Sequence, residues 1–490
     1  MLAPNRFRFV GQDAELLTPA DWNHADRAKL WLYNLHYFDD LRAVGADSRT
    51  PWHRDLIMRW QADNPALTGN GWEPYPLSLR MVNWVAWILA GHEPTQEVVD
   101  SLAVQARALR ATLEFHLLGN HLLANAKALI FAGCFFAGAE ANGWLRTGLD
   151  LLDAELREQI LADGGHFELS PMYHAVILED VLDLIQLGLI FPAELDATQP
   201  TWRDTAARML AWLSTMTHPD GEVAFFNDAA SGIARTCADL AGYAAGLGVS
   251  AEEDAGPLRP LTASGYVRLQ SGPFCALFDT AEIGPSYLPG HGHADVLSFE
   301  VSLDGRRLVT NGGTSTYAPG QLRDAERATA SHATVEIDGH SSSEVWASFR
   351  VGRRAHPHGV ACGVNDGSIW AEASHDGYRW LPGRPMHQRR VDMSATALRI
   401  TDRVTGAGSH TVIGRFPLHP MLISVSAEQN GWRLELTGGR VVRATVSGAG
   451  QHFVADGYYA PAFGHRVARP VLTWRHEGTL PLNIEMRFEL

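Results

Sequence analysis

The chain has 490 residues, of which 46% are hydrophobic and 19% charged, and 55 Asp and Glu against 40 Lys and Arg give a formal net charge of −15 at pH 7. This composition is typical of a globular protein with large cores and excludes a disordered chain. The acidic balance excludes a general nucleic-acid binder, because phosphate neutralisation needs a basic surface. It leaves room for an acidic polysaccharide bound in a locally basic cleft.

The sequence contains no recognisable targeting or membrane segment. No run approaches the roughly 18 consecutive apolar residues of a membrane span, and no apolar stretch follows the basic residues near the N-terminus. We therefore expect no membrane insertion and a cytoplasmic location, or a periplasmic or secreted one if a signal was removed. The four cysteines are too scattered to predict a disulfide framework or a thiolate zinc site.

The first half of the chain is predicted to be helical. From about residue 25 to 250, apolar residues recur at helical spacing, and Gly, Pro and Asn mark short connections. So many helical hairpins favour a toroid over a four-helix bundle. The predicted helices are Ser78–Ala90, Val104–Leu117, His121–Phe136, Gly143–Ile160, Met172–Leu189, Thr201–Thr215 and Ala229–Leu247.

The second half changes to strand patterns between turn signals, such as Asp304-Gly305 in a predicted hairpin. We therefore predict an α+β multidomain chain, with an N-terminal (α/α) toroid over residues 1–255 and a large antiparallel β-sandwich over residues 256–490. The predicted strands are Gly265–Leu269, Phe274–Asp279, Val296–Leu303, Arg307–Thr310, Thr334–Asp338, Ile369–Ala373, Leu398–Asp402, Gly431–Leu436 and Val441–Val446.

Two polar clusters open predicted helices. In GNHLLAN, Asn120 suits an N-cap as well as a functional role. In FELSPMYH, Ser170 suits an N-cap and Pro171 the first turn. Tyr173 and His174 then lie at the positive end of the helix dipole, which favours an anionic ligand or a phenolate, although a packed tyrosine fits the same pattern.

Two further clusters precede predicted strands. In HGHAD, His291 and His293 are two residues apart, so their rings point the same way, and Asp295 can orient one of them. The glycines on either side of His291 indicate a close approach of another group, which favours function over chance. The polar segment Arg323–His332 precedes another strand, and His332 taken alone fits a structural histidine.

Basic and aromatic clusters fit either a binding surface or ordinary structure. The segments 31–38 and 71–76 are rich in aromatic residues and suit sugar stacking or core packing equally. The sequence has no P-loop, no G-x-S-x-G and no H-E-x-x-H. The basic clusters form either a local cationic wall or a solvated strand face, and they contain Arg350, Arg353, Arg354, Arg389 and Arg390.

The motifs GNHLLAN, FELSPMYH, HGHADVLSFEV with NGG, and SHATVEIDG, in this order, resemble the heparinase II/III-like polysaccharide lyases. Alginate and oligoalginate lyases share this design. The resemblance extends from about Trp31 to the C-terminal strands. It implies an (α/α) toroid followed by an antiparallel β-sandwich, with β-elimination of a uronic-acid polysaccharide as the reaction. Glycosaminoglycans of the hyaluronan, chondroitin or heparan type are favoured as substrates, with alginate next.

The resemblance also implies roles for individual residues. Asn120 and His121 match the pair that neutralises the uronate carboxylate, and Tyr173 matches the catalytic tyrosine. His291 matches a histidine of the β-domain that acts as base or helper. We further expect substrate contacts from His174, Trp72, Glu73, Arg327 and Arg389.

A metal site is implied by the same resemblance. His293 and His332 match two metal-binding histidines of the β-domain, where zinc is the usual ion. The family's third ligand is an aspartate, and Asn311 stands in its place here. A neutral amide binds Zn²⁺ less well, so we expect a structural divalent metal, with zinc first and Mn²⁺ or Ca²⁺ as alternatives.

Two alternatives to the lyase stay open. A glycoside hydrolase on an α/α toroid would use a carboxylate pair, with Glu73, Glu168 and Asp228 as candidates, but no paired arrangement is visible. A non-catalytic polysaccharide-binding or exopolysaccharide-biosynthesis-associated protein would fit the missing aspartate at position 311. The endo or exo mode and the oligomeric state stay open as well.

Overall fold

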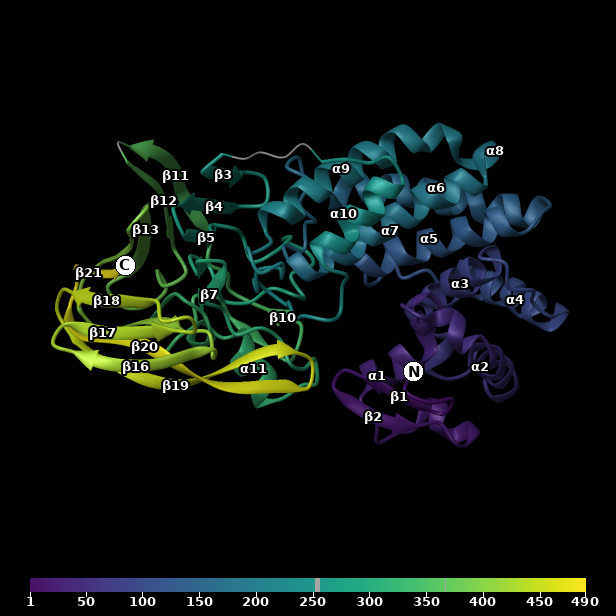
Figure 1. Cartoon of the computed structure of the whole chain (residues 1–490), viewed down its shortest axis with the longest axis horizontal. Coiled ribbons are helices and arrows are strands. Elements are labelled where there is room, and N and C mark those ends of the chain that lie inside the picture. The colour runs from purple at the N-terminus through teal and green to yellow at the C-terminus, as the bar shows by residue number, and fades with distance from the viewer. Residues whose placement is uncertain (252–255, 366) are drawn as a thin grey trace. The chain divides into compact units, whose positions relative to one another are not determined.

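The computed structural model describes residues 1–251, 256–365 and 367–490, and Figure 1 shows it from purple at the N-terminus to yellow at the C-terminus. Contacts divide it into two compact units, one of Met1–Gln159 with Asp180–Arg203 and the other of Ile160–Glu179 with Asp204–Leu490. The predicted domain border lies between residues 255 and 256, and residues 252–255 are outside the described part of the chain. The change from helices to strands occurs across it.

The N-terminal part is helical, as predicted.

Among the described residues, no helix combines the length and apolar character needed to cross a bilayer. The α-helices are α1 (Lys29–Tyr37), α2 (Thr50–Asp63), α3 (Pro74–Leu89), α4 (Gln96–Ala111), α5 (Gly119–Phe135), α6 (Ala139–Gln159), α7 (Pro171–Ile190), α8 (Pro192–Leu195), α9 (Gln199–Thr215), α10 (Cys237–Gly246) and α11 (Gln321–Arg327). Short 3₁₀ turns are η1 (Pro19–Asn23), η2 (Asp39–Arg42), η3 (Ala46–Arg49), η4 (Asn70–Trp72), η5 (Asp196–Thr198) and η6 (Thr329–Ser331).

Helix α4 begins at Gln96, eight residues before the predicted Val104. Two other predicted helix boundaries are wrong for local reasons. Helix α4 ends at Ala111, before the predicted Leu117, because the backbone amide of Glu114 bonds to the Asn125 side chain and its carbonyl closes a turn. Helix α10 begins at Cys237, after the predicted Ala229, because the Thr236 hydroxyl accepts from the amide of Asp239 and caps the helix there.

The C-terminal part consists of antiparallel sheets. The eight-stranded sheet has the order β11-β12-β13-β14-β21-β18-β17-β16, and sheets of four and five strands have the orders β19-β20-β15-β8 and β3-β4-β5-β6-β7. Small hairpins pair β1 with β2 and β9 with β10. The strands are β1 (Arg6–Phe9), β2 (Gln12–Glu15), β3 (Leu258–Leu261), β4 (Tyr266–Ser271), β5 (Phe274–Asp279), β6 (Phe299–Leu303), β7 (Arg306–Val309), β8 (Val335–Ile337), β9 (Val345–Trp346), β10 (Arg350–Val351), β11 (Pro357–Asn365), β12 (Ser368–His375), β13 (Met386–Ser394), β14 (Ala397–Thr405), β15 (Ser409–Pro417), β16 (Leu422–Glu428), β17 (Gly431–Leu436), β18 (Val441–Ser447), β19 (Gln451–Ala462), β20 (His465–Thr479) and β21 (Leu482–Glu489).

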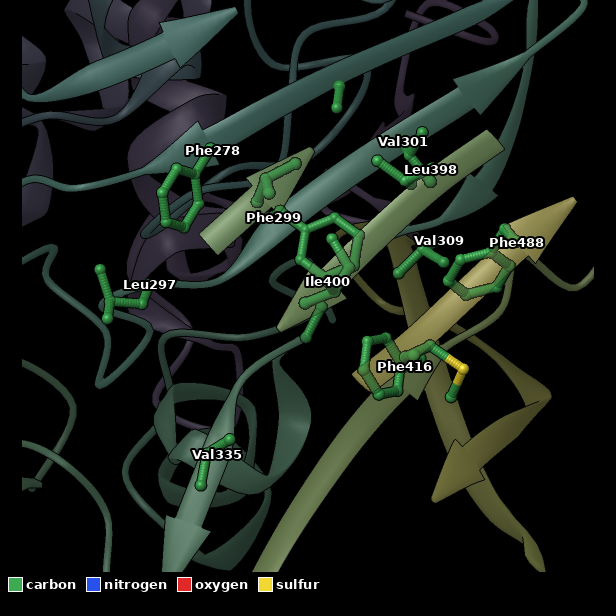
Figure 2. Packing of buried hydrophobic residues seen from close by; sticks show 14 of the residues in the cluster. Phe278, Leu297, Phe299, Val301, Val309, Val335, Leu398, Ile400, Phe416 and Phe488 are labelled. Carbon is green, nitrogen blue, oxygen red and sulfur yellow. The ribbon is translucent and has the colours of Figure 1, made fainter. Parts of the chain in front are cut away.

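One continuous hydrophobic core joins the sheets of the second unit, as Figure 2 shows. Phe299 of β6, Ile400 of β14, Phe416 of β15 and Phe488 of β21 are all fully buried in it. Burying each such side chain contributes about 1.5–3 kcal/mol. The three large sheets are therefore held as one body by shared side-chain packing.

Two arginines expected to bind substrate are buried in this framework. Arg389 on β13 forms two hydrogen bonds to the carboxylate of Asp402, at 2.8 and 2.9 Å, and donates to the carbonyl of Leu297 at 2.8 Å. Arg327 of α11 donates twice to the carbonyl of Gly292, at 3.1 and 2.8 Å. Both side chains are fully buried, so the predicted contact with substrate is wrong for each.

His174 and Trp72 are core residues as well. The ring of His174 stacks on Trp212 at 4.3 Å, and its Nε2 donates to the carbonyl of Met209 at 2.9 Å. Trp72 is 8% exposed and packs on Trp60 at 5.7 Å. Neither side chain is available to a polysaccharide, so these two expectations are also wrong.

Burial lowers the pKa of His174 to about 3, more than three units below the ordinary histidine value of about 6.5. The unfolded chain therefore binds a proton at this site that the folded chain does not bind. The stabilising contribution is complete above the unfolded pKa and falls as the pH drops below it. We expect His174 to reduce the free energy of unfolding by about 1.6 kcal/mol between pH 6.5 and pH 5.

Urea unfolding at the two pH values, for wild type and His174→Phe, measures this effect. The variant should lose stability at both pH values, because the Met209 carbonyl loses its donor, but it should depend less on pH than wild type. The exposed His358, changed to Phe, is the matched control and should leave the pH dependence unchanged. Equal pH dependence in wild type and His174→Phe would contradict the prediction.

Candidate active site

Tyr173 lies in the first turn of α7, where its position is set by the cap predicted from the sequence. The backbone amide of Tyr173 donates to Ser170 Oγ at 3.2 Å, with Pro171 as the first helical residue. The phenol ring lies against the imidazole of His291, with ring centroids 4.0 Å apart. The second unit thus brings together a phenol and an imidazole that are far apart in sequence.

The orientation of His291 is fixed by a buried carboxylate. His291 Nδ1 is 2.9 Å from Asp228 Oδ2, and because a carboxylate only accepts, Nδ1 carries the hydrogen. Nε2 is therefore the acceptor nitrogen of the neutral ring, and it lies 3.7 Å from a carboxylate oxygen of Glu168. Gly292 has no side chain because a Cβ there would lie 2.4 Å from the carbonyl oxygen of Ile283.

Asp228 is the most heavily bonded group of the site. It is fully buried and accepts from His291, from His293 Nε2 at 2.9 Å and from both terminal nitrogens of Arg323, one of them at 2.6 Å. Burial alone would raise its pKa, but Arg323 and the two histidines hold the pKa well below the ordinary value. Asp228 is therefore an anion across the physiological range and serves as the orienting partner of His291.

Tyr317 and Arg323 complete this cluster. The hydroxyls of Tyr317 and Tyr173 are hydrogen-bonded at 3.0 Å, and the Arg323 guanidinium lies 5.0 Å from the Tyr317 ring centroid. Burial raises the pKa of Tyr317 well above the ordinary value, so its phenol keeps its proton. The sequence marked Arg323 only as part of a polar segment and contained no signal for Tyr317.

The backbone beside these residues is held in left-handed conformations that ordinary residues rarely adopt. Leu169, Asn227 and Leu297 have φ of 59°, 56° and 60°, and Leu118, just before the GNH motif, has φ of 58°. Each such conformation costs on the order of 1–3 kcal/mol and persists only where contacts enforce it. The Leu169 carbonyl accepts from Asn227 Nδ2 at 2.9 Å and from the Tyr266 hydroxyl at 2.7 Å.

Asn120 and His121 lie in the first unit, on the first turn of α5. The N-cap of this helix is the residue before Gly119, so the alternative role of Asn120 as the cap is wrong. His121 Nδ1 bonds to Glu114 Oε1 at 3.0 Å, and Asn125 donates to Glu114 Oε2 at 2.9 Å. The His121 ring lies 4.3 Å from the Tyr75 ring. Glu114, which the sequence did not single out, therefore orients His121 as Asp228 orients His291.

Glu73 also belongs to the first unit and is partly exposed. Its carboxylate accepts from the Tyr33 hydroxyl and is paired with Lys29 at 2.9 Å. The negative group raises the pKa of Tyr33 further, beyond the effect of burial, so that phenol is neutral. Glu73 is the one residue of the predicted substrate-binding set whose side chain reaches solvent, at 39% exposure.

The predicted metal residues fit an ion only in part. His293 Nδ1 and His332 Nε2 lie 3.3 Å apart in full burial. Burial lowers the pKa of His293 to about 4 and that of His332 well below the ordinary value, so both neutral rings can turn a lone pair toward one ion. The Asn311 amide oxygen accepts from the Ala333 backbone at 3.2 Å, and its nitrogen donates to Ser298 Oγ at 3.3 Å. In the described part of the chain, no three His, Cys, Asp or Glu residues gather in a ligating arrangement.

Two family models match the chain, in the order expected from the motifs. The heparinase II/III N-terminus matches residues 92–245, and the heparinase II/III-like C-terminal model matches residues 253–479. Together they cover well over half of the chain.

Curated relatives are similar over shorter stretches. A heparin-sulfate lyase of Pedobacter heparinus is 26% identical over 245 residues, which is 45% of this chain and 36% of the relative. One from Bacteroides stercoris is 34% identical over 118 residues, which is 23% of this chain and 17% of the relative. The matched segments thus span about a third of these relatives or less.

Solved structures share the fold over nearly the whole chain. A heparinase III structure has a TM-score of 0.75 at 17% identity, covering 94% of this chain and 76% of that chain. The heparan sulfate lyase HepC from Pedobacter heparinus has a TM-score of 0.67 at 17% identity, covering 99% of this chain and 81% of that chain. This likeness and the succession of helices and antiparallel sheets confirm the predicted fold class. With both family models matched in order along this fold, the protein belongs to the heparinase II/III-like superfamily.

Proposed function

We propose that this protein is a polysaccharide lyase that cleaves a heparan-type glycosaminoglycan by β-elimination. The observation that carries the proposal is the phenol of Tyr173 against the imidazole of His291, whose Nδ1 is held by the buried Asp228. The heparan class is favoured because the named relatives are heparin-sulfate lyases. Hyaluronan, chondroitin and alginate, which the motifs left open, receive no support from these relatives.

The reaction requires neutralisation of the substrate's carboxylate. The C5 hydrogen of a uronate is barely acidic, because its removal places further negative charge beside the carboxylate. Donors aimed at that group stabilise the charge as it develops. Asn120 and His121 would supply them, with His121 held in one orientation by Glu114.

A base and an acid then complete the elimination. The base takes the C5 proton, the electron pair forms the C4–C5 double bond, and the C4–O4 bond breaks as the acid protonates the leaving oxygen. The acceptor Nε2 of His291 suits the base, since Asp228 stabilises the imidazolium that forms. The hydroxyl of Tyr173 suits the acid, and the Tyr317 hydroxyl at 3.0 Å can hold its orientation.

The geometry of the same residues does not favour a glycoside hydrolase. A hydrolase needs two carboxylates facing the glycosidic bond. Asp228 is fully buried, with ionic hydrogen bonds on both oxygens, so it cannot serve as a nucleophile or a general acid. Of the three candidate carboxylates, Asp228 is therefore excluded from both catalytic roles of a glycosidase.

The function is tested by incubating the protein separately with heparan sulfate, chondroitin sulfate, hyaluronan and alginate. Near-ultraviolet absorbance from the new conjugated double bond should rise with heparan sulfate. Reducing ends without that absorbance would instead indicate a hydrolase. Binding of a polymer without either product would indicate a non-catalytic binder.

Replacing Tyr173 and Tyr317 one at a time distinguishes the proposed acid from the hydroxyl that is hydrogen-bonded to it. Tyr173→Phe should lower kcat by about 10²–10⁴-fold, the usual contribution of general acid–base catalysis. Tyr317→Phe removes one hydrogen bond, so we expect a loss of about 3- to 12-fold. Tyr458→Phe, at an exposed tyrosine, is the control. Near-wild-type turnover of Tyr173→Phe would remove this residue from the mechanism.

We further propose a structural divalent metal between His293 and His332, which would tie the loop of His291 to the segment before β8. Because Asn311 contributes only a neutral amide, the ion should be held weakly. Asn311→Asp should therefore raise the zinc content of protein dialysed against trace zinc, and should raise its melting temperature. Equal zinc content in wild type, Asn311→Asp and His332→Ala would contradict the proposal.

A further inference from the structure

The short hairpin of β9 and β10, residues 345–351, displays large aromatic side chains to solvent. Trp346 is 44% exposed and Phe349 is 42% exposed. At its tip, Ala347 and Ser348 have φ of 44° and 68°, conformations that cost energy unless contacts enforce them. Exposed aromatic side chains on a strained turn are typical of a binding element rather than of a packing unit.

Two buried arginines of α11 hold the hairpin in place. Arg323 donates to the carbonyl of Ser348 at 3.1 and 3.0 Å, and Arg327 donates to the carbonyls of Trp346 and Arg350, each at 3.3 Å. Arg323 is also the partner of Asp228, and Arg327 also binds the carbonyl of Gly292. The hairpin is therefore anchored to the same groups that position His291.

The tip of the hairpin touches the reacting groups directly. The Phe349 ring lies 5.7 Å from the His291 ring and 5.3 Å from the Tyr317 ring. A Cβ added to Gly290, next to His291, would lie 3.7 Å from Phe349 Cβ, so the two turns are close neighbours. The aromatic surface thus begins at the catalytic imidazole.

A third exposed aromatic residue contacts a cation that follows the hairpin in the chain. Trp380 is 45% exposed, and the Arg353 guanidinium lies 4.0 Å from its ring centroid. The backbone of Arg353 is tied to the start of the hairpin, because its carbonyl accepts from the amide of Glu344 at 2.7 Å. Arginine stacked on an aromatic ring keeps its edge donors available for a planar anion.

We propose that Trp346, Trp380 and Arg353 form a subsite that binds a sugar ring of the acidic polysaccharide next to the residue undergoing elimination. Pyranose rings present apolar C–H faces that pack on indole rings, while their sulfate or carboxylate groups pair with arginine. The Arg353 guanidinium supplies a local positive charge for a polyanion despite the net charge of −15. This subsite would add a substrate contact to the proposed lyase function. The identity of its ligand rests on that proposed function.

The test compares Trp346→Ala and Trp380→Ala with wild type, on heparan sulfate. Each should raise KM by about 3- to 10-fold with kcat little changed, because the lost contact is made before and during the reaction alike. Arg353→Gln should raise KM at low salt and weaken its rise with added salt. Phe453→Ala, at another exposed phenylalanine on β19, is the control and should leave KM unchanged.

A binding measurement separates this proposal from the lyase proposal. In a Tyr173→Phe background, calorimetry with size-defined heparan sulfate oligosaccharides should show weaker binding after Trp346→Ala, whether or not any product forms. Trp346→Leu, which keeps apolar volume but removes the ring, serves if the alanine variant unfolds. If wild type cleaves heparan sulfate and every tryptophan variant has the same KM and the same affinity, the proposed subsite is overturned. The proposed lyase function would still hold in that case. The subsite would also be overturned if the tryptophan variants changed their oligomeric state but bound the oligosaccharides with the affinity of the parent protein.

Discussion

The buried ion pair of Asp228 and Arg323 is the interaction on which the candidate site depends. A carboxylate without exposure is tolerated only because a guanidinium and two imidazoles donate to it. The same guanidinium contacts Ser348 and lies over Tyr317, so a single buried cation connects the orienter of His291, the hydroxyl partner of Tyr173 and the aromatic hairpin. Removing either partner would leave an unpaired charge in the interior and release all three.

Each unit contains a histidine that a buried carboxylate holds in one orientation. Asp228 holds His291 by Nδ1, and Glu114 holds His121 by Nδ1, so the orientation of each imidazole is fixed through the same ring nitrogen. Asn125 of the GNHLLAN motif supports Glu114, which explains the second asparagine of that motif in physical terms. Left-handed residues at Leu118, Leu169 and Asn227 set the backbone direction beside these groups.

Much of the fold could be predicted from local patterns. Long apolar helices such as α5 and α7 were predicted within a few residues, since their periodicity and the Ser170 cap are local signals. Strand β13 was missed because His387 and Arg389 occupy buried positions of its alternation, and their buried partner Asp402 lies on another strand. The hydrophobic alternation of this strand is interrupted, because two of its four inward residues are polar and paired across the sheet.

The sequence by itself determined the family and the order of helical and sheet regions, and it marked Tyr173 and His291 as candidates. These inferences rest on motifs whose residues are close together in the chain. Only the tertiary structure decided that Arg327, Arg389, His174 and Trp72 belong to the framework. It also decided that Asp228 bonds to His291, Tyr317 to Tyr173 and Glu114 to His121. Burial and hydrogen-bond partners are properties of segments that meet in space. The identity of a polar residue does not indicate whether its side chain faces solvent or a buried charged group. Only its contacts in the folded chain distinguish these two environments.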